Sequence, residues 1–247
     1  MEVLRVILEG EVTSFRYPFT MVGRQLSFLM PPPATIYGHV CSALGEWVDP
    51  RSFRFAYTFS SAATFDDLEH IHVVSASSGK LPGTDLPKAL EGNINPFRRQ
   101  LLFRPRLVLY LTRPDWREAF LHPAYPVVLG RSQDLCTYTE VRVVRLEQRE
   151  RGYFEHTLLP FEYPLKLPQG IVLNMPKWLD VHRNRAPQFA RYTLVNRRVN
   201  TDDERILVMG EPPRAFWVDP ESPADEEGRQ RVLVFHDWSE ITWDANA

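Results

Sequence analysis

Two stretches of the chain are rich in arginine and contain no acidic residue. Between Glu91 and Asp115 the arginines are Arg98, Arg99, Arg104, Arg106 and Arg113, and between Asp180 and Asp202 they are Arg183, Arg185, Arg191, Arg197 and Arg198, with His182 beside them. Guanidinium groups pair with phosphate oxygens through charge-assisted hydrogen bonds. The stretches predict two local basic patches for an anionic ligand, although arginines that merely cover exposed strand faces would give the same pattern.

The rest of the composition is that of an ordinary globular protein. The 247 residues are 44% hydrophobic and 24% charged, with a formal net charge of −2, so the chain can bury a proper core. A near-neutral charge argues against a free-standing nucleic-acid binder, which normally carries a basic excess. Acid is concentrated in D-P-E-S-P-A-D-E-E, residues 219–227, which indicates a solvated loop.

Motifs for catalysis, metals and cofactors are missing from the sequence. His70 and His72 would share one face of a strand, but no third ligand follows at a metal-binding spacing. There is no G-x-S-x-G, no phosphate-cradling Walker pattern and no H-E-x-x-H. We therefore expect no catalytic residue, no metal site and no cofactor.

A proline-rich entry leads into an expected helix between Phe28 and Gly45, in F-L-M-P-P-P-A-T-I-Y-G-H-V-C-S-A-L-G. The third proline suits the first helical turn, where its missing N–H costs nothing. Apolar side chains recur at helical spacing at Tyr37, Val40, Leu44 and Trp47. The start of this helix is a potential anion site, although any chain entering its first helix could look the same.

Most of the remaining pattern predicts strands. Phe53, Phe55, Tyr57 and Phe59 alternate with smaller or polar residues, which is typical of a strand that faces a core, with base stacking as the alternative. Further strands are expected at 3–12, 70–76, 101–112 and 125–130, and a short helix at 115–121. The order is strand, helix, strand, strand, strand, helix, strand.

Short apolar segments separated by prolines follow residue 148, which predicts a small β-rich C-terminal subdomain. Trp178, Trp238 and Trp243 are either partner anchors or core residues. The two cysteines, Cys41 and Cys136, offer neither a disulfide framework nor metal spacing. The N-terminal segment M-E-V-L-R-V-I-L-E-G fits neither a secretory signal nor a membrane span, so we expect a cytoplasmic protein without a membrane partner.

Four segments together resemble a known family. They are Phe15-Arg16, Pro32-Pro33-Ala34-Thr35-Ile36-Tyr37-Gly38, Asn95-Pro96-Phe97-Arg98-Arg99-Gln100-Leu101-Leu102 and Leu129-Gly130-Arg131-Ser132-Gln133-Asp134. In this order, over roughly residues 1–145, the chain resembles the Cas-five family. These are CRISPR-associated proteins of the RAMP superfamily that cap the 5′ handle of the crRNA in type I Cascade complexes.

The resemblance implies an α+β fold, which agrees with the predicted order of elements. It implies a ferredoxin-like or RRM-like βαββαβ domain over residues 1–148, with an inserted thumb hairpin at about 78–104, and a β-rich C-terminal subdomain at 149–247. The sequence between the expected strands that end near Ser77 and begin near Leu101 is too long for an ordinary connection; it reads S-S-G-K-L-P-G-T-D-L-P-K-A-L-E-G-N-I-N-P-F-R-R-Q. A plain surface loop is the competing interpretation of this stretch.

The implied function is to hold the crRNA 5′ handle without cutting it. The expected RNA-binding residues are Arg16, Arg24, Thr35, Tyr37, Gly38, Phe97, Arg98, Arg99, Arg104, Gly130, Arg131 and Ser132. Arginines and helix-start amides would bind phosphates, and Phe97 would stack on a base. The implied partners are the crRNA, the Cascade backbone subunit and the Cascade large subunit, with target DNA reached indirectly through the complex.

Two alternatives of a different class remain open. The first is a metal-independent endoribonuclease that processes precursor crRNA, with Tyr37 or His39 as base and Arg131 or Arg99 as the cation that stabilises the phosphate. The sequence departs from the processing branch of the family, because Arg98-Arg99-Gln100 stands where that branch has a Lys-His pair. The second is a purely structural protein whose arginines pair with acidic partners.

Overall fold

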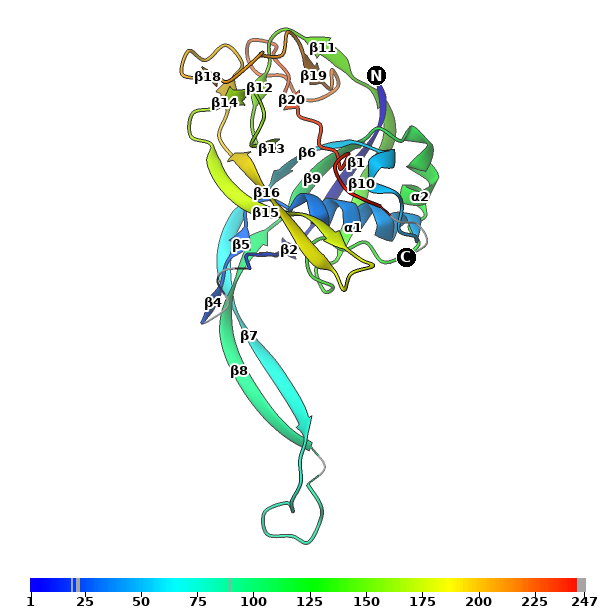
Figure 1. Ribbon diagram of the computed structural model, residues 1–247, viewed down its shortest axis with the longest axis vertical. Helices are drawn as coiled ribbons and strands as arrows, with labels where there is room; N and C mark the ends of the chain where they lie inside the picture. The colour runs from blue at the N-terminus through cyan, green and yellow to red at the C-terminus, as the bar shows by residue number, and fades with distance from the viewer. Residues whose placement is uncertain (19, 21–22, 89, 244–247) are drawn as a thin grey trace.

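The computed structural model describes residues 1–18, 20, 23–88 and 90–243. The chain forms a compact body from which one long hairpin projects (Figure 1). Within the described residues, none of the helices is both long enough and apolar enough to span a lipid bilayer. The protein is built mostly from antiparallel strands with a few short helices, as expected for an α+β chain.

Seven strands form the main sheet in the described part of the chain. In spatial order they are β10 (Cys136–Arg145), β1 (Glu2–Gly10), β9 (Arg106–Leu111), β6 (Phe55–Ser60), β13 (Thr157–Pro160), β16 (Ala186–Val195) and β15 (Ile171–Asp180). Every neighbouring pair in this sheet is antiparallel. The helix α1 (Pro33–Leu44) lies between β1 and β6 in the chain. The short helices η2 (Pro114–Trp116) and α2 (Arg117–Leu121) lie between β9 and β10.

Alternating side chains give the sheet two buried faces. In β9, Leu107, Leu109 and Leu111 belong to the large core that includes α1 and α2, whereas Val108 and Tyr110 belong to a smaller core on the other face. The predicted aromatic stripe at Phe53, Phe55, Tyr57 and Phe59 is fully buried in the large core. The prediction that these rings form a core is confirmed.

The helix α1 begins where the proline run predicts. Pro33 occupies its first turn, and Gly45 ends it in the left-handed conformation with φ 81°. Tyr37 and Val40 are buried, as their spacing predicts. Trp47 lies beyond the end of the helix and is 52% exposed, so its expected place on the buried helical stripe was wrong. A short 3-10 helix, η1 (Pro50–Ser52), then leads into β6.

The projecting hairpin consists of β7 (Ala63–Ala76) and β8 (Leu90–Phe103), which pair antiparallel along their whole length. The hairpin therefore begins at Ala63, well before the expected start near residue 78. The expected strand 101–112 is in fact the end of β8 and the separate strand β9. Most side chains of β7 are exposed on both faces, so no apolar alternation marks the strand in the sequence.

The base of the hairpin is held by short strands of the N-terminal segment. Two of them pair with β8: β2 (Val12–Thr13) is antiparallel to it and β4 (Arg24–Gln25) is parallel to it. Between them in the chain, β3 (Phe15–Arg16) pairs with β5 (Ser27–Phe28). Residues 125–130 do not form the expected strand. Val128 makes an isolated bridge with Leu135, and the regular strand is β10, because Pro126 lacks an N–H and Gly130 has φ 93°.

The segment after residue 148 contributes β13, β15 and β16 to the main sheet, so this sheet runs across the expected boundary at 148/149. Its other strands form small sheets: β11 (Glu147–Arg149) with β19 (Phe216–Val218) and β20 (Val232–Leu233), β12 (Tyr153–Phe154) with β17 (Val199–Asn200), and β14 (Leu165–Lys166) with β18 (Leu207–Val208). A separate apolar cluster lies among these strands. Trp178 and Trp238 are buried in the large core, so the interpretation as core residues holds for both.

Candidate functional site

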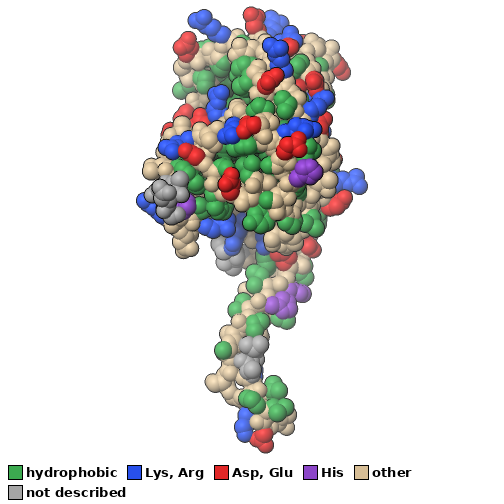
Figure 2. All heavy atoms as spheres, turned by 90° about the vertical axis from the view of Figure 1, so that its right-hand side faces the viewer, with side chains coloured by type: hydrophobic (Ala, Val, Ile, Leu, Met, Phe, Trp, Pro, Cys, Tyr) green, Lys and Arg blue, Asp and Glu red, His purple; other side chains and the backbone are tan. Residues whose placement is uncertain are grey.

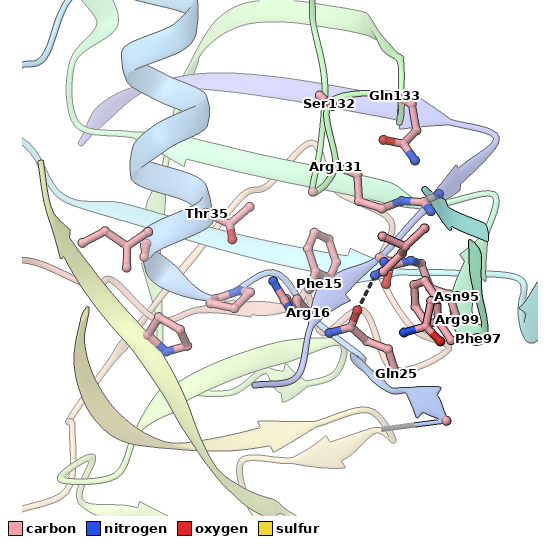
Figure 3. A pocket seen from close by; sticks show the side chains of 18 of the residues that line it. Phe15, Arg16, Gln25, Thr35, Asn95, Phe97, Arg99, Arg131, Ser132 and Gln133 are labelled. Atoms are coloured by element: carbon pink, nitrogen blue, oxygen red, sulfur yellow. Dashed lines mark hydrogen bonds between the residues drawn. The ribbon is translucent and has the colours of Figure 1, made fainter. Parts of the chain in front are cut away.

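A cavity of about 740 Å³ lies at the base of the hairpin. Its walls come from β3, β4, the start of α1, β8, the turn after residue 129 and the strand β15. In Figure 3 the side chains of Arg131, Arg99 and Phe97 lie on one side of the cavity, and Thr35, on the first turn of α1, lies on the opposite side. Segments far apart in the sequence therefore meet around one space.

Two arginines in the wall share a carboxylate. Arg99 Nε donates to Glu69 Oε2 at 2.7 Å, and Arg131 Nη1 donates to the other oxygen of Glu69. Arg99 also donates through Nη1 to Gln25 Oε1 at 2.8 Å, which is the dashed line in Figure 3. The side chains of both arginines are about five-sixths buried, at 14% and 16% exposed, so Glu69 fixes two guanidinium groups next to the cavity.

The turn that carries Arg131 is held by a buried carboxylate. Asp134 is 1% exposed and accepts hydrogen bonds from Arg131 Nη2 at 2.7 Å and from the backbone amides of Ser14 and Arg131 at 3.2 Å. Burial opposes the charge on Arg131. Its hydrogen bond to Asp134 and the charges of Asp134 and Glu69 outweigh burial and raise the pKa of Arg131 above its ordinary value.

Gly130 lets this turn approach the N-terminal segment. Its φ is 93°, and a Cβ atom placed on it would lie 2.6 Å from Thr13 Oγ1 and 2.7 Å from the backbone oxygen of Ser14. A side chain at this position would therefore clash with the backbone of the neighbouring segment and would strain the turn. The glycine is needed to keep Arg131 at the cavity.

The N-terminus of α1 opens onto the same cavity. Within the described part of the chain no side chain caps it, its first turn contains no acidic residue, and Pro32, Ala34 and Thr35 line the wall. The partial positive charge of an uncapped helix start favours an anion. Among the described residues that line the cavity there are three arginines and no acidic side chain, because Glu69 and Asp134 lie behind the arginines that they bind.

The cavity brings together seven of the twelve residues expected to bind RNA: Arg16, Thr35, Phe97, Arg99, Gly130, Arg131 and Ser132. Phe97 is half-buried, and the guanidinium carbon of Arg99 lies 5.0 Å from its ring centroid. This pair combines an aromatic face with a cation, which is the combination that stacks on a base and binds the adjoining phosphate.

The other five lie elsewhere. Arg24 pairs with Asp66 at 2.9 Å on the exposed side of β4, and Arg98 is exposed on β8 beside it. Gly38 lines a smaller neighbouring cavity. Arg104 lines a third cavity together with Glu9 and Glu11, where the acids oppose an anion.

Tyr37 differs most from its expected role. It is 2% exposed and its hydroxyl donates to the backbone oxygen of Val48 at 2.6 Å. Burial raises the pKa of this hydroxyl well above its ordinary value. Tyr37 lies on the face of α1 that packs against Trp178 and Trp238, so it belongs to the core rather than to the cavity wall.

His39 is also inside the protein. Its Nδ1 lies 3.0 Å from the backbone oxygen of Val128, which can only accept, so Nδ1 is the donor, and Tyr138 then donates to Nε2 at 2.9 Å. Burial lowers the pKa of His39 to about 4, against the smaller opposite effect of the Val128 hydrogen bond. Both ring nitrogens are therefore engaged in the fold.

Sequence reasoning missed Gln25 and Glu69 and gave Asp134 no role of its own. Gln25 is 4% exposed and lines the cavity. Its Oε1 accepts from Arg99, and its Nε2 has no hydrogen-bond partner in the described part of the chain. Nothing near Gln25 or Glu69 in the sequence marks them, because both reach Arg99 only through the folding of the hairpin base. No group of three or more metal-ligating side chains lies together among the described residues.

Comparisons with known proteins concern the fold. No protein-family model matches the chain, and no curated protein sequence matches it. A solved structure described as a CRISPR RNA-guided surveillance complex contains a chain with 16% identity and a TM-score of 0.50, over 86% of this chain and 95% of that one. A CRISPR protein from Archaeoglobus fulgidus matches at 11% identity and a TM-score of 0.49, over 96% and 100% of the two chains. The chain thus has a fold similar to that of a protein from a CRISPR complex.

Proposed function

We propose that the protein is a non-catalytic crRNA-binding subunit of a type I CRISPR Cascade effector complex, of the Cas-five family, that holds the 5′ handle of the crRNA. The observation that carries the proposal is the cavity at the hairpin base. Its lining combines arginines, an aromatic ring and an uncapped helix N-terminus and lacks acids among the described residues. These are the groups that bind phosphates and splayed bases of single-stranded RNA.

The arrangement of the first four long strands of the body supports this assignment. The chain passes through β1, α1, β6, β9, α2 and β10, and the strands lie in the order β10, β1, β9, β6 with all neighbours antiparallel. This order supports the proposed ferredoxin-like βαββαβ arrangement, the plan of RNA-recognition domains. The hairpin β7–β8, inserted between β6 and β9, then corresponds to the thumb.

The projecting hairpin supports a role inside a larger assembly. Leu68, Val74 and Ile94 are each 60–62% exposed, and Figure 2 shows hydrophobic side chains along the hairpin. Exposed apolar side chains in such number indicate a protein contact. We assign this contact to the Cascade backbone subunit. The large subunit would dock elsewhere on the body, target DNA would be read by pairing with the guide, and the assembly would be cytoplasmic.

The inward placement of Tyr37 and His39 favours binding over cleavage. A general base must reach the 2′-hydroxyl that it deprotonates, whereas the Tyr37 hydroxyl and both His39 nitrogens already bind groups of the protein. The alternative of a metal-independent endoribonuclease would therefore have to use other groups.

The proposal is tested with the purified full chain, a 5′-labelled repeat RNA and EDTA, followed by filter binding across a salt series and a denaturing gel. We expect the RNA to stay intact and to be retained through its 5′ handle. Replacing Phe97 and Arg99 together by alanine should abolish retention. Site-specific cleavage that survives EDTA would overturn the non-catalytic assignment, and equal retention of RNAs with and without the handle would overturn the assignment of the ligand.

A further inference from the structure

A second basic feature stands next to the cavity, on the turn 181–185 between β15 and β16. Ala186 N donates to the backbone oxygen of Arg183 at 3.0 Å, and the two residues enclosed, Asn184 and Arg185, have φ values of 52° and 58°. Two successive positive φ values are characteristic of a tight type I′ turn. The hydrogen bond and these backbone angles define the position of Arg185 at the turn that joins β15 to β16.

Arg185 lines a smaller cavity of about 200 Å³ together with Thr35, Gly38 and Ser42 of α1. This smaller cavity shares Ala34, Thr35, Gly130 and Leu179 with the cavity at the hairpin base. The two spaces therefore adjoin at the N-terminus of α1. A ligand that fills the larger cavity can continue along the helix towards Arg185.

The arginines of the two adjoining cavities differ in how far nearby acids neutralise them. Arg99 and Arg131 are balanced by Glu69 and Asp134, with which they form ion pairs. Among the described residues, no acidic side chain pairs with Arg185 and none lines the smaller cavity. Arg183, on the same turn, lies within 3.7 Å of Asp180 and does not line either cavity. Arg185 therefore offers an added anion a charge that no described acidic side chain neutralises.

The surface of α1 between the larger cavity and Arg185 is open. A Cβ atom placed on Gly38 would meet no atom of the other described residues within 4 Å. Small side chains on this face of α1 let an extended backbone lie close to the helix, and the uncapped helix start adds a partial positive charge. The adjoining cavities, the open space at Gly38 and the charge of Arg185 favour an extended anion that is too long for the larger cavity alone.

We propose that Arg185 is a second phosphate contact, and that single-stranded RNA bound in the larger cavity runs across the N-terminus of α1, over Gly38, to the turn 181–185. This inference rests on the proposed RNA-binding function and extends it to the C-terminal half of the chain. The part recognised there is the sugar-phosphate backbone, since the smaller cavity has no aromatic side chain placed for stacking other than the buried His39.

The test measures filter binding of a labelled single-stranded RNA of about 12 nucleotides to the full-length chain as a function of salt concentration. Arg185→Gly removes the charge at an exposed position whose φ suits glycine, so the variant should fold normally. We expect this variant to bind about 3- to 10-fold more weakly, with a salt slope lower by about 0.7. Arg185→Lys should recover most of the affinity.

Arg183→Ala is the matched control, because it removes the same charge from the same turn outside the cavity. Equal losses in Arg183→Ala and Arg185→Gly would overturn the inference in favour of a general charge effect. Unchanged binding by Arg185→Gly, with binding weakened in Phe97→Ala, would overturn the inference and leave the proposed function standing. Failure of the wild type to retain RNA at low salt would overturn both.

Gly38→Leu tests the path without changing charge. The leucine side chain should enter the open space over α1 and weaken binding of the 12-nucleotide RNA, while binding of a shorter RNA of about 4 nucleotides in the larger cavity should change little. Equal affinities of wild type and Gly38→Leu for the longer RNA would contradict the proposed path. If an acidic peptide such as poly-glutamate binds through Arg185 and RNA does not, the turn is a protein contact and the inference fails.

Discussion

Glu69 and Arg99 face each other diagonally across the base of the hairpin, with Arg99 Nε donating to Glu69 Oε2 at 2.7 Å. The other oxygen of the same carboxylate binds Arg131, which lies on the turn of the body. Glu69 therefore has two effects that oppose each other. It orients two guanidinium groups beside the cavity, and it neutralises part of the charge that would attract a phosphate.

Replacing Glu69 by Gln should strengthen RNA binding at low salt. The amide oxygen still accepts one hydrogen bond from an arginine, while the net charge at the cavity rises by one. We expect a gain of a few fold in affinity and a salt slope steeper by about 0.7. Filter binding across a salt series measures both. Asp66→Asn, which removes a charge from the exposed pair with Arg24, is the control and should change affinity less. Weaker binding by Glu69→Gln would mean that orientation of the arginines outweighs their charge.

Phe97→Ala should weaken RNA binding by about 1–3 kcal/mol, the usual contribution of one stacked base. The ring lines the cavity beside Arg99, whereas Phe65, also on the hairpin, packs against Phe103 outside the cavity. Phe65→Ala is therefore the matched control and should leave affinity within about twofold. Fluorescence anisotropy with a labelled RNA resolves this difference. Equal effects of the two substitutions would indicate that the hairpin acts only as a scaffold.

The buried histidines predict that stability falls as the solution becomes acidic. Burial lowers the pKa values of His39 and His236 to about 4 from the ordinary 6.5. Between these values the unfolded chain binds more protons than the folded protein. Stability from these groups is therefore complete above pH 6.5 and is lost as the pH falls towards 4, by about 1–2 kcal/mol for each histidine by pH 5.

Urea unfolding at a series of pH values checks this dependence. His236→Gln keeps a side-chain donor for the backbone oxygen of Leu158 and should reduce the slope of stability against pH in that window. The double substitution of the exposed His70 and His72 by Gln is the control for removing histidine from the protein surface. A wild-type protein whose stability is flat between pH 6.5 and 5 would contradict the assignment.

Asp219→Ala should destabilise the protein by about 1–3 kcal/mol, because Arg5 and the Tyr110 hydroxyl both lose a buried acceptor, although Glu140 still pairs with Arg5 at 2.6 Å. Asp219 is 1% exposed, accepts from Arg5 Nη1 at 2.5 Å and from the Tyr110 hydroxyl at 3.0 Å, and so joins the C-terminal segment to β1 and β9. The exposed pair Glu9 and Arg106 offers a comparison, and Glu9→Ala should cost less than about 1 kcal/mol. Chemical denaturation compares the two, and similar losses would show that burial of the Arg5 pair adds nothing.

Several features of the fold could be predicted because they depend on neighbours in the sequence. The proline run sets the start of α1, and the alternation of Phe53, Phe55, Tyr57 and Phe59 gives a buried strand. The strand β7 could be predicted only in part, since both of its faces are exposed and its pattern has no apolar alternation. The strand β10 was missed for a related reason, because its mixed polar pattern follows a more apolar segment that contains Pro126 and Gly130.

For the candidate site, the sequence by itself determined which cations and aromatics exist and that no acid lies between Glu91 and Asp115, the stretch that contains Phe97 and Arg99. Only the tertiary structure decided that Arg99 and Arg131 share Glu69, whose sequence separations from them are 30 and 62 residues. It also decided that the first turn of α1, with Thr35, opens onto a cavity whose other walls come from distant segments. Backbone preferences act between neighbouring residues and can be seen in the sequence, but charge pairing and burial depend on which distant segments the fold brings together.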